Sequence, residues 1–105
     1  HLYHRKLQED AAHVMQRALD AGVHTILMPA IDRNTPSEVD RLPKLDGLRC
    51  LQMAGIHPCD VHEAPLITEQ ELSDWAQRVH AIGIGETGLD YYWSKDHIDA
   101  QKHSL

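Results

Sequence analysis

Apolar residues along the chain follow first a helical and then a strand-like spacing. Over Arg5–Ala21 they recur every three or four residues, which predicts an amphipathic helix. Gly22 is suited to the left-handed backbone conformation that ends many helices. Val23–Met28 is a short apolar run closed by a proline, and it predicts a strand. The apolar residues of the predicted helix are Leu7, Ala11, Val14, Met15 and Ala18.

Two capping sequences mark further helix starts. Thr35–Glu38 combines an N-cap threonine, a proline at the first helical position and a capping-box glutamate, and Pro43 stops this helix early. Thr68 and Glu71 form a second capping box. The amphipathic helix predicted after it has its apolar residues at Leu72, Trp75, Ala76 and Val79.

Two more segments have the composition of strands. Leu48–Ile56 and Val79–Gly85 are β-compatible, and Ile98–Leu105 starts another helix. Strands that alternate with helices about every 30 residues indicate βαβ units, so the predicted fold class is α/β with a parallel sheet. Ligands bind at the carboxyl ends of the strands in such sheets. His57 and Glu86, which follow two of the predicted strands, are therefore the first candidates for a site.

Length and composition set limits on these predictions. The 105 residues make one domain at most, well below the roughly 250 of a complete (β/α)₈ barrel. Apolar residues at 42% and charged residues at 25% are ordinary for a soluble globular chain. No apolar stretch is long enough to span a bilayer, and no signal peptide is visible. Cys50 and Cys59 form neither a disulfide framework nor a Cys-x-x-Cys motif, which favours a reducing, cytoplasmic setting.

Charge and histidine content narrow the possible chemistry. A net charge of −6 counts against a broad basic surface for nucleic acid, although bound divalent cations can supply positive charge locally. The nine histidines suggest a metal or acid–base site only where their positions fit one. Seven of them have no second metal ligand at a suitable spacing in the sequence: His4, His13, His24, His62, His80, His97 and His103.

Glu86 lies in the most informative segment of the chain. Gly83 and Gly85 before it let the backbone pack closely, and Gly88 permits a sharp turn after it. A carboxylate delivered from a strand into the mouth of a sheet can bridge two divalent metals or act as a base. The same residue could instead be an N-cap or a salt-bridge partner in a βα turn, and its spacing alone leaves both interpretations open.

The uninterrupted run Gly85–Tyr92 resembles the Gly-Glu-[Thr/Ile]-Gly-Leu-Asp-Tyr-Tyr motif of the TatD-type metal-dependent deoxyribonucleases, a branch of the metal-dependent TIM-barrel hydrolases. Ala54–Pro58 is similar to the Gly-[Ile/Val]-His-Pro turn of that family, and Ala21–Val23 to the Ala-Gly-Val that enters its second strand. Gln101 falls where the family places a glutamine in its fourth helix. The resemblance implies that residues 1–105 are the N-terminal part of a (β/α)₈ TIM barrel, cut at both ends.

The same resemblance assigns roles to individual residues. Glu86 matches the metal-bridging carboxylate of the family, and His1 matches the second histidine of a His-x-His metal pair whose first member would lie upstream. The alternative for His1 is a solvated terminal residue. His57 would contact phosphate or support the metal ligands, or else be a turn histidine that caps a strand end. Cys59 beside it is a small rim residue rather than a nucleophile, because no adjacent base is evident.

The loop after Glu86 has two further candidates. Asp90 would orient this loop through backbone hydrogen bonds. Tyr91, together with Tyr92 and Trp93, could stack on a base, although aromatic residues in such loops more often pack against the barrel rim.

The reaction implied by the resemblance is hydrolysis of DNA phosphodiester bonds at single-stranded ends by metal-activated water. Two cations about 3.5–4 Å apart would clamp the phosphate, and imidazole and carboxylate ligands suit Mg²⁺, Mn²⁺ or Zn²⁺. No membrane and no obligate protein partner are expected. The chain contains two of about six expected ligands. Hydrolysis of an ester or amide on the same barrel, or a catalytically incomplete half-barrel that serves as a binding piece, therefore remain alternatives.

Overall fold

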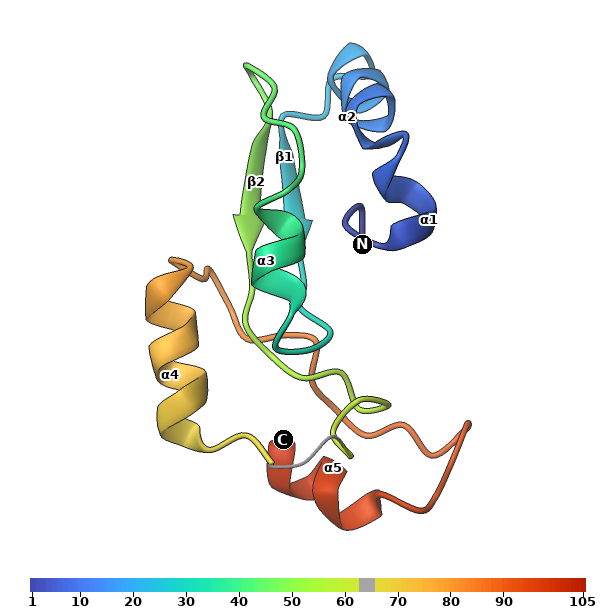
Figure 1. The fold of residues 1–105 in the computed structure, drawn as a ribbon, viewed down its shortest axis with the longest axis vertical. Coiled ribbons are helices and arrows are strands. Elements are labelled where there is room, and N and C mark those ends of the chain that lie inside the picture. The colour runs from blue at the N-terminus through green and yellow to red at the C-terminus, as the bar shows by residue number, and fades with distance from the viewer. Residues whose placement is uncertain (63–65) are drawn as a thin grey trace.

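The computed structural model describes residues 1–62 and 66–105 as helices packed on a small parallel sheet (Figure 1). The two strands pair with Thr25 opposite Arg49 and Met28 opposite Gln52. This arrangement confirms the α/β class. In chain order the elements are α1 (Arg5–Gln8), α2 (Ala11–Asp20), β1 (Thr25–Met28), α3 (Thr35–Val39), β2 (Arg49–Gln52), α4 (Glu69–Arg78) and α5 (Ile98–Ser104).

The predicted helix over Arg5–Ala21 is divided into α1 and α2. Asp10, at the junction, has the non-helical angles φ −108° and ψ 8°, and its carboxylate pairs with His13 Nδ1 at 2.8 Å instead of capping the backbone. Ala11 is buried, whereas Leu7, which was predicted to lie on the apolar face, is exposed. The prediction of one continuous helix was wrong, because the buried face begins only at α2.

The end of α2 agrees with the sequence analysis. Gly22 has a φ of 86°, and its N–H donates to the Leu19 carbonyl at 2.9 Å. The N–H of Val23 donates to the Ala18 carbonyl at 2.8 Å. These two bonds form a Schellman motif, which satisfies the last carbonyls of the helix and directs the chain into β1.

The start of α3 differs from the prediction. The helix begins at Thr35 itself, and Asp32 Oδ1 accepts from the backbone N–H groups of Asn34 at 2.8 Å and Thr35 at 3.0 Å. Thr35 Oγ1 accepts instead from the N–H of Ile31 at 3.1 Å and that of Asp32 at 3.2 Å. The capping box between Thr35 and Glu38 was therefore wrong, because Asp32 supplies the capping carboxylate from upstream.

The predicted strand Val79–Gly85 is reduced to one parallel bridge, between Ala54 and Ile84. Its first residues belong to the end of α4, where His80 has a φ of 50° and the N–H of Ala81 still bonds to the last turn of the helix. Too few residues then remain for a regular ladder. The strand assignment was wrong, although the segment lies parallel beside the end of β2.

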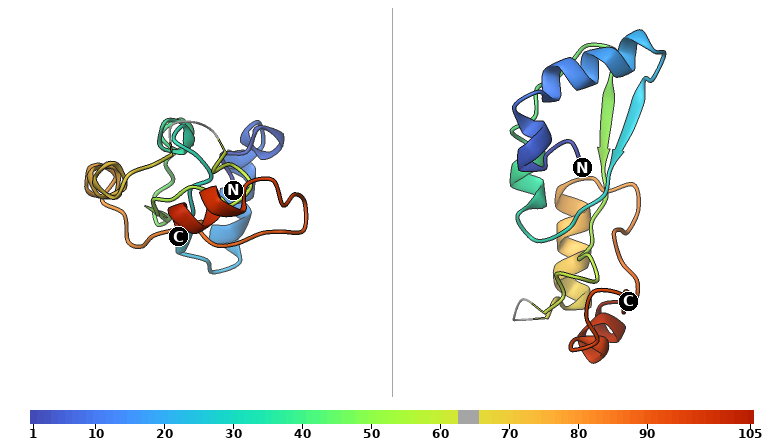
Figure 2. Two further views of the ribbon diagram at one scale, coloured as in Figure 1. Left: turned by 90° about the horizontal axis from the view of Figure 1, so that it is seen from below. Right: turned by 90° about the vertical axis from the view of Figure 1, so that its right-hand side faces the viewer.

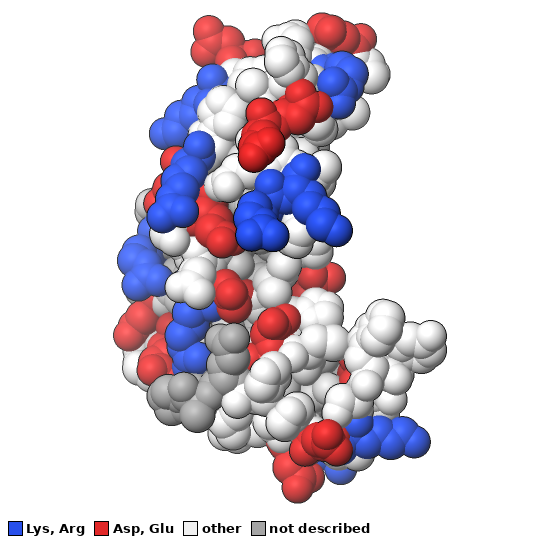
Figure 3. All heavy atoms as spheres, turned by 45° about the vertical axis from the view of Figure 1, so that its right-hand side comes forward, with Lys and Arg blue, Asp and Glu red and all other residues white. Residues whose placement is uncertain are grey.

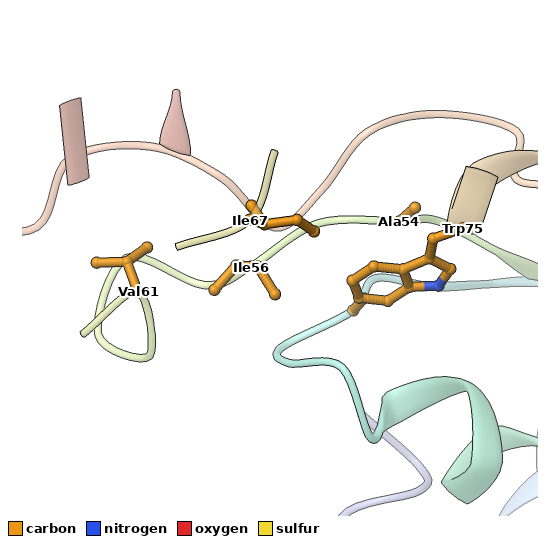
Figure 4. Packing of buried hydrophobic residues seen from close by; sticks show 6 residues of the cluster. Ala54, Ile56, Val61, Ile67 and Trp75 are labelled. Carbon is orange, nitrogen blue, oxygen red and sulfur yellow. The ribbon is translucent and has the colours of Figure 1, made fainter. Parts of the chain in front are cut away.

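The second capping box, at the start of α4, is present as predicted. Glu71 N–H donates to Thr68 Oγ1 at 3.2 Å, and Glu71 Oε2 accepts from Thr68 N–H at 2.8 Å. The backbone hydrogen bond from Thr68 lowers the pKa of the Glu71 carboxyl. Trp75, one turn further on, is buried in a cluster with Ala30, Ala54, Ile56, Val61 and Ile67 (Figure 4). The cap therefore fixes the start of the helix that contains Trp75, whose indole packs in this core.

Helices α1, α2 and α3 lie to one side of the two strands, α4 lies beyond their carboxyl ends, and the opposite face of the strands is left uncovered (Figure 2). Leu27, Ile82 and Ile84 are each about half exposed, whereas the neighbouring Met28 is buried. Lys and Arg are interspersed with Asp and Glu on the face drawn in Figure 3. Within residues 1–62 and 66–105, none of the helices has the length and apolar character that crossing a membrane requires.

Replacement of Thr68 by alanine should destabilise the protein by about 1 kcal/mol, because the Glu71 N–H loses its acceptor at the start of α4. Thr68→Ser keeps a hydroxyl and should cost less than about 0.5 kcal/mol. Urea denaturation followed by circular dichroism measures both changes. Equal stability of the alanine and serine variants would contradict the importance of the cap.

Candidate functional site

Glu86 is held at the carboxyl end of the sheet by the backbone of Ala30. Ala30 N–H donates to the Gly85 carbonyl at 2.9 Å, and the Ala30 carbonyl accepts from Glu86 N–H at 2.8 Å. Gly55 lies against the same peptide, which is cis: a Cβ at position 55 would lie 2.7 Å from the Glu86 carbonyl oxygen. Ala30 is fully buried, so only small residues fit where these three backbones meet.

The residues on either side of Ala30 hold two other segments. The Tyr3 hydroxyl donates to the Pro29 carbonyl at 2.6 Å. The Ile31 carbonyl accepts from the N–H of His57 at 2.7 Å. The segment Pro29–Ile31 therefore fixes the N-terminal residues, the Glu86 loop and the His57 turn to one end of the sheet.

The structure brings His1 and Glu86 together. His1 Nε2 lies 2.9 Å from Glu86 Oε2, with the two side chains 36% and 38% exposed. Oε2 itself is excluded from solvent, and within the described residues no hydrogen bond of good geometry reaches it. A solvent-excluded carboxylate oxygen is costly unless a cation or a hydrogen-bond donor satisfies it, and His1 Nε2 is the nitrogen that lies within reach.

The chemistry of this pair fits a divalent cation. Imidazole nitrogen and carboxylate oxygen are ligands that Mg²⁺, Mn²⁺ or Zn²⁺ accept in various combinations. Two ligand atoms at right angles on a metal with bonds of about 2.1 Å lie about 3 Å apart, close to the 2.9 Å between His1 Nε2 and Glu86 Oε2. Three or more His, Cys, Asp or Glu side chains do not converge anywhere in the described parts of the chain. The pair alone is therefore too small a set of ligands to hold such a cation.

Tyr3 supports His1, a role that the sequence analysis missed. The two rings meet edge to face with centroids 5.5 Å apart, and Tyr3 is only 2% exposed. Burial raises the pKa of the Tyr3 hydroxyl to about 12, and the nearby Glu86 carboxylate raises it as well. The hydroxyl therefore stays protonated and keeps its donor role toward Pro29. A single tyrosine among polar residues has no periodic pattern that could have revealed this contact.

The side-chain contacts of His57 lie within its own turn. His57 Nδ1 accepts from Cys59 N–H at 3.1 Å and lies 3.6 Å from Asp60 Oδ2. Because Nδ1 acts as an acceptor, the neutral ring has its proton on Nε2. His57 would therefore offer an N–H donor to a ligand rather than a lone pair to a metal.

Asp90 joins the loop after Glu86 to both α5 and the His57 turn. Its N–H and carbonyl form a pair of hydrogen bonds, each 2.8 Å long, with the side-chain amide of Gln101. Its Oδ1 accepts from Tyr92 N–H at 2.9 Å, and its Oδ2 lies 3.7 Å from Cys59 Sγ. Desolvation and the Asp90 carboxylate raise the pKa of the Cys59 thiol. Gln101 is only 3% exposed, and the sequence analysis gave it no physical role.

The three aromatic residues of this loop differ in exposure. Tyr91 is half-buried, whereas Tyr92 is 84% exposed and Trp93 is 77% exposed. The rings of Tyr92 and Trp93 meet edge to face with centroids 4.8 Å apart. Tyr91 was the aromatic residue preferred for the site, but the more accessible rings are those of its two neighbours.

Comparison with known proteins gives a consistent result. A family model described as "TatD related DNase" matches residues 1–105. The "Uncharacterized metal-dependent hydrolase YabD" of Bacillus subtilis (strain 168) is 31% identical over 97% of this chain. The "3'-5' ssDNA/RNA exonuclease TatD" of Escherichia coli (strain K12) is 29% identical over 79% of it. The match covers 40% of the first relative and 32% of the second, so the chain spans well under half of their length.

Gly55→Ala should destabilise the protein by about 1–3 kcal/mol, because the added methyl group collides with the backbone of Glu86. Gly83→Ala is the matched control, since a Cβ there would meet only the flexible end of Met53 at 3.5 Å. Urea denaturation of the two variants tests the difference. Equal tolerance of alanine at both positions would show that the close approach at Gly55 is not required.

Stability should also fall at alkaline pH through Tyr3. Its folded pKa of about 12 lies above the ordinary value of 10.0, so this contribution is complete below pH 10 and is lost as the pH rises toward 12. Two pKa units correspond to about 3 kcal/mol. Tyr3→Phe loses the hydrogen bond to Pro29 and should be less stable at neutral pH, and it should lose less stability between pH 10 and pH 12 because it has no hydroxyl to ionise. Parallel alkaline profiles for the two proteins, measured by denaturation, would contradict this assignment.

Proposed function

Because the chain belongs to the TatD related DNase family, we propose that the full-length protein is a metal-dependent hydrolase that cleaves DNA phosphodiester bonds at single-stranded ends. The observation that carries this proposal is the contact between His1 and the solvent-excluded oxygen of Glu86. Relatives in Shigella flexneri and Escherichia coli, with 30% and 29% identity, have the name "3'-5' ssDNA/RNA exonuclease TatD", which supports the choice of substrate.

We propose that residues 1–105 form the N-terminal part of a (β/α)₈ TIM barrel. The support is the parallel pairing of β1 with β2, the further parallel bridge from Ala54 to Ile84, and the position of α1, α2 and α3 to one side of the two strands. Barrel strands are buried on both faces, the inner face by layers of apolar side chains. The exposed Leu27, Ile82 and Ile84 are suited to such an inner face.

In the proposed mechanism, His1 and Glu86 would hold divalent metal together with further ligands of the full-length protein. Two ions of Mg²⁺, Mn²⁺ or Zn²⁺ would be bound. They would lower the pKa of bound water and polarise a phosphate oxygen. Ala30 fixes Glu86 through its backbone, and Tyr3 supports the imidazole of His1. His57 donates from Nε2 to a phosphate oxygen of the substrate, and Asp90 holds the adjoining loop through Gln101.

A second candidate is a metal-dependent hydrolase that acts on an ester or amide. It is compatible with the Bacillus subtilis relative, whose alignment covers 97% of this chain and whose name specifies a metal-dependent hydrolase without a substrate. The two free thiols, Cys50 and Cys59, support a cytoplasmic setting in either case. We propose no membrane and no obligate protein partner for the reaction.

Glu86→Gln in the full-length protein should lower the hydrolysis of a single-stranded oligonucleotide by at least about 100-fold, because the neutral amide is a poor metal ligand. Metal binding, measured by calorimetry, should weaken as well, and chelation should abolish activity. Glu9→Gln alters an exposed glutamate outside the site and should leave the rate unchanged. Full activity of Glu86→Gln would disprove the mechanism, and cleavage of esters but not of DNA would favour the second candidate.

A further inference from the structure

A hollow of about 170 Å³ lies between the His57 turn and the loop that follows Glu86. One side begins with Pro58 and Cys59, directly after His57. The other side includes Asp90 and Trp93, and Trp93 follows Glu86 by seven positions, a separation of at most about 25 Å along the chain. The hollow therefore adjoins both segments assigned to the phosphate and metal chemistry.

Flat rings form much of the lining of this hollow. Trp93 borders it while remaining 77% exposed, which leaves most of the indole accessible. His62 and His97, which also line it, are stacked with ring centroids 4.7 Å apart and planes inclined by 18°. Tryptophan is enriched at interfaces, because its ring combines a large apolar face with a polar N–H.

The hollow is also held in shape before any ligand arrives. Gln101, a buried residue of the lining, forms two hydrogen bonds with the backbone of Asp90. The carboxylate of Asp90 contacts Cys59. The segment with Trp93 therefore starts from a fixed point rather than from a loose loop. A preformed ring surface loses little conformational freedom when a second ring stacks on it.

We propose that this hollow binds an unpaired nucleobase of the substrate strand, with Trp93 as the stacking surface. The proposal rests on the proposed function and deepens it, since it names the part of the substrate that is recognised beyond the phosphate. Every base has a flat face, so stacking of this kind tolerates sequence variation. A base within a duplex is already stacked and paired, and the contact therefore selects single-stranded ends.

The test uses the full-length protein with chelator present, so that binding is measured without hydrolysis. Trp93→Ala should weaken binding of a fluorescent single-stranded oligonucleotide by about 5-fold to 150-fold, and Trp93→Phe should restore most of the affinity. An oligonucleotide with abasic sites at its 3′ end keeps the phosphates but lacks the bases. It should bind the wild type and Trp93→Ala equally. Leu89→Ala, an exposed apolar change in the same loop outside the hollow, should leave binding unchanged.

A second measurement examines the accessibility of Trp93 in the full-length protein. The fluorescence of Trp93 is the part that is lost in Trp93→Phe; acrylamide should quench this part readily, and the oligonucleotide should protect it. Shielding of Trp93 without nucleic acid would overturn the proposal, because the ring would then pack against other parts of the protein. The proposal would also be overturned if Trp93→Ala weakened the binding of abasic and intact oligonucleotides equally. Absence of metal-dependent cleavage would instead refute the proposed function, whatever the binding results.

Discussion

The backbone of Pro29–Ile31 is the constraint on which the candidate site depends. Proline has no N–H, so the hydrogen-bond ladder between β1 and β2 cannot continue through Pro29. The next residue, Ala30, bonds to Gly85 and Glu86 instead, and Ile31 bonds to the N–H of His57. Since Tyr3 is attached to the Pro29 carbonyl, three segments distant in sequence meet at three consecutive residues.

This convergence relies on small residues at the crossing points. Ala30, Ala54 and Gly55 are buried where the backbones approach one another, and a larger side chain would separate them. Two apolar cores adjoin these crossing points: Ala30 and Ala54 belong to the core around Trp75 of α4, and the other core contains Tyr3 and Met28. The cores therefore fix the helices against the strands, while hydrogen bonds between backbones set the positions of the site residues.

Local patterns predicted the features that depend on local chemistry. The helix end at Gly22 and the capping box at Thr68 involve contacts between near neighbours in sequence, so the pattern was sufficient. The start of α3 was missed because Asp32 competes with Thr35 for the capping role. Neither the contact of Tyr3 with Pro29 nor the bonds of Gln101 to Asp90 can be derived from spacing, because they join distant parts of the chain.

The contact between His1 and Glu86 could be anticipated only through resemblance to a family, which named both residues without their separation. The structure adds a distance, a solvent-excluded oxygen and the residues that support the pair. It also changes the emphasis within the aromatic loop, from Tyr91 to the more exposed Trp93.

The left-handed conformation of His80 has a consequence for how this part of the chain tolerates changes in length. It fixes where α4 ends, and only four residues, Ala81 to Ile84, then lead to the Gly85–Glu86 backbone that bonds to Ala30. Backbone hydrogen bonds from Ala81 to Ala76 and from Gly85 to Ala54 hold the two ends of this connection. An inserted residue would have to break one of these bonds or displace Glu86 from Ala30. Length variation in this connection is therefore restricted by the hydrogen bonds at its ends, independently of which amino acids occupy it.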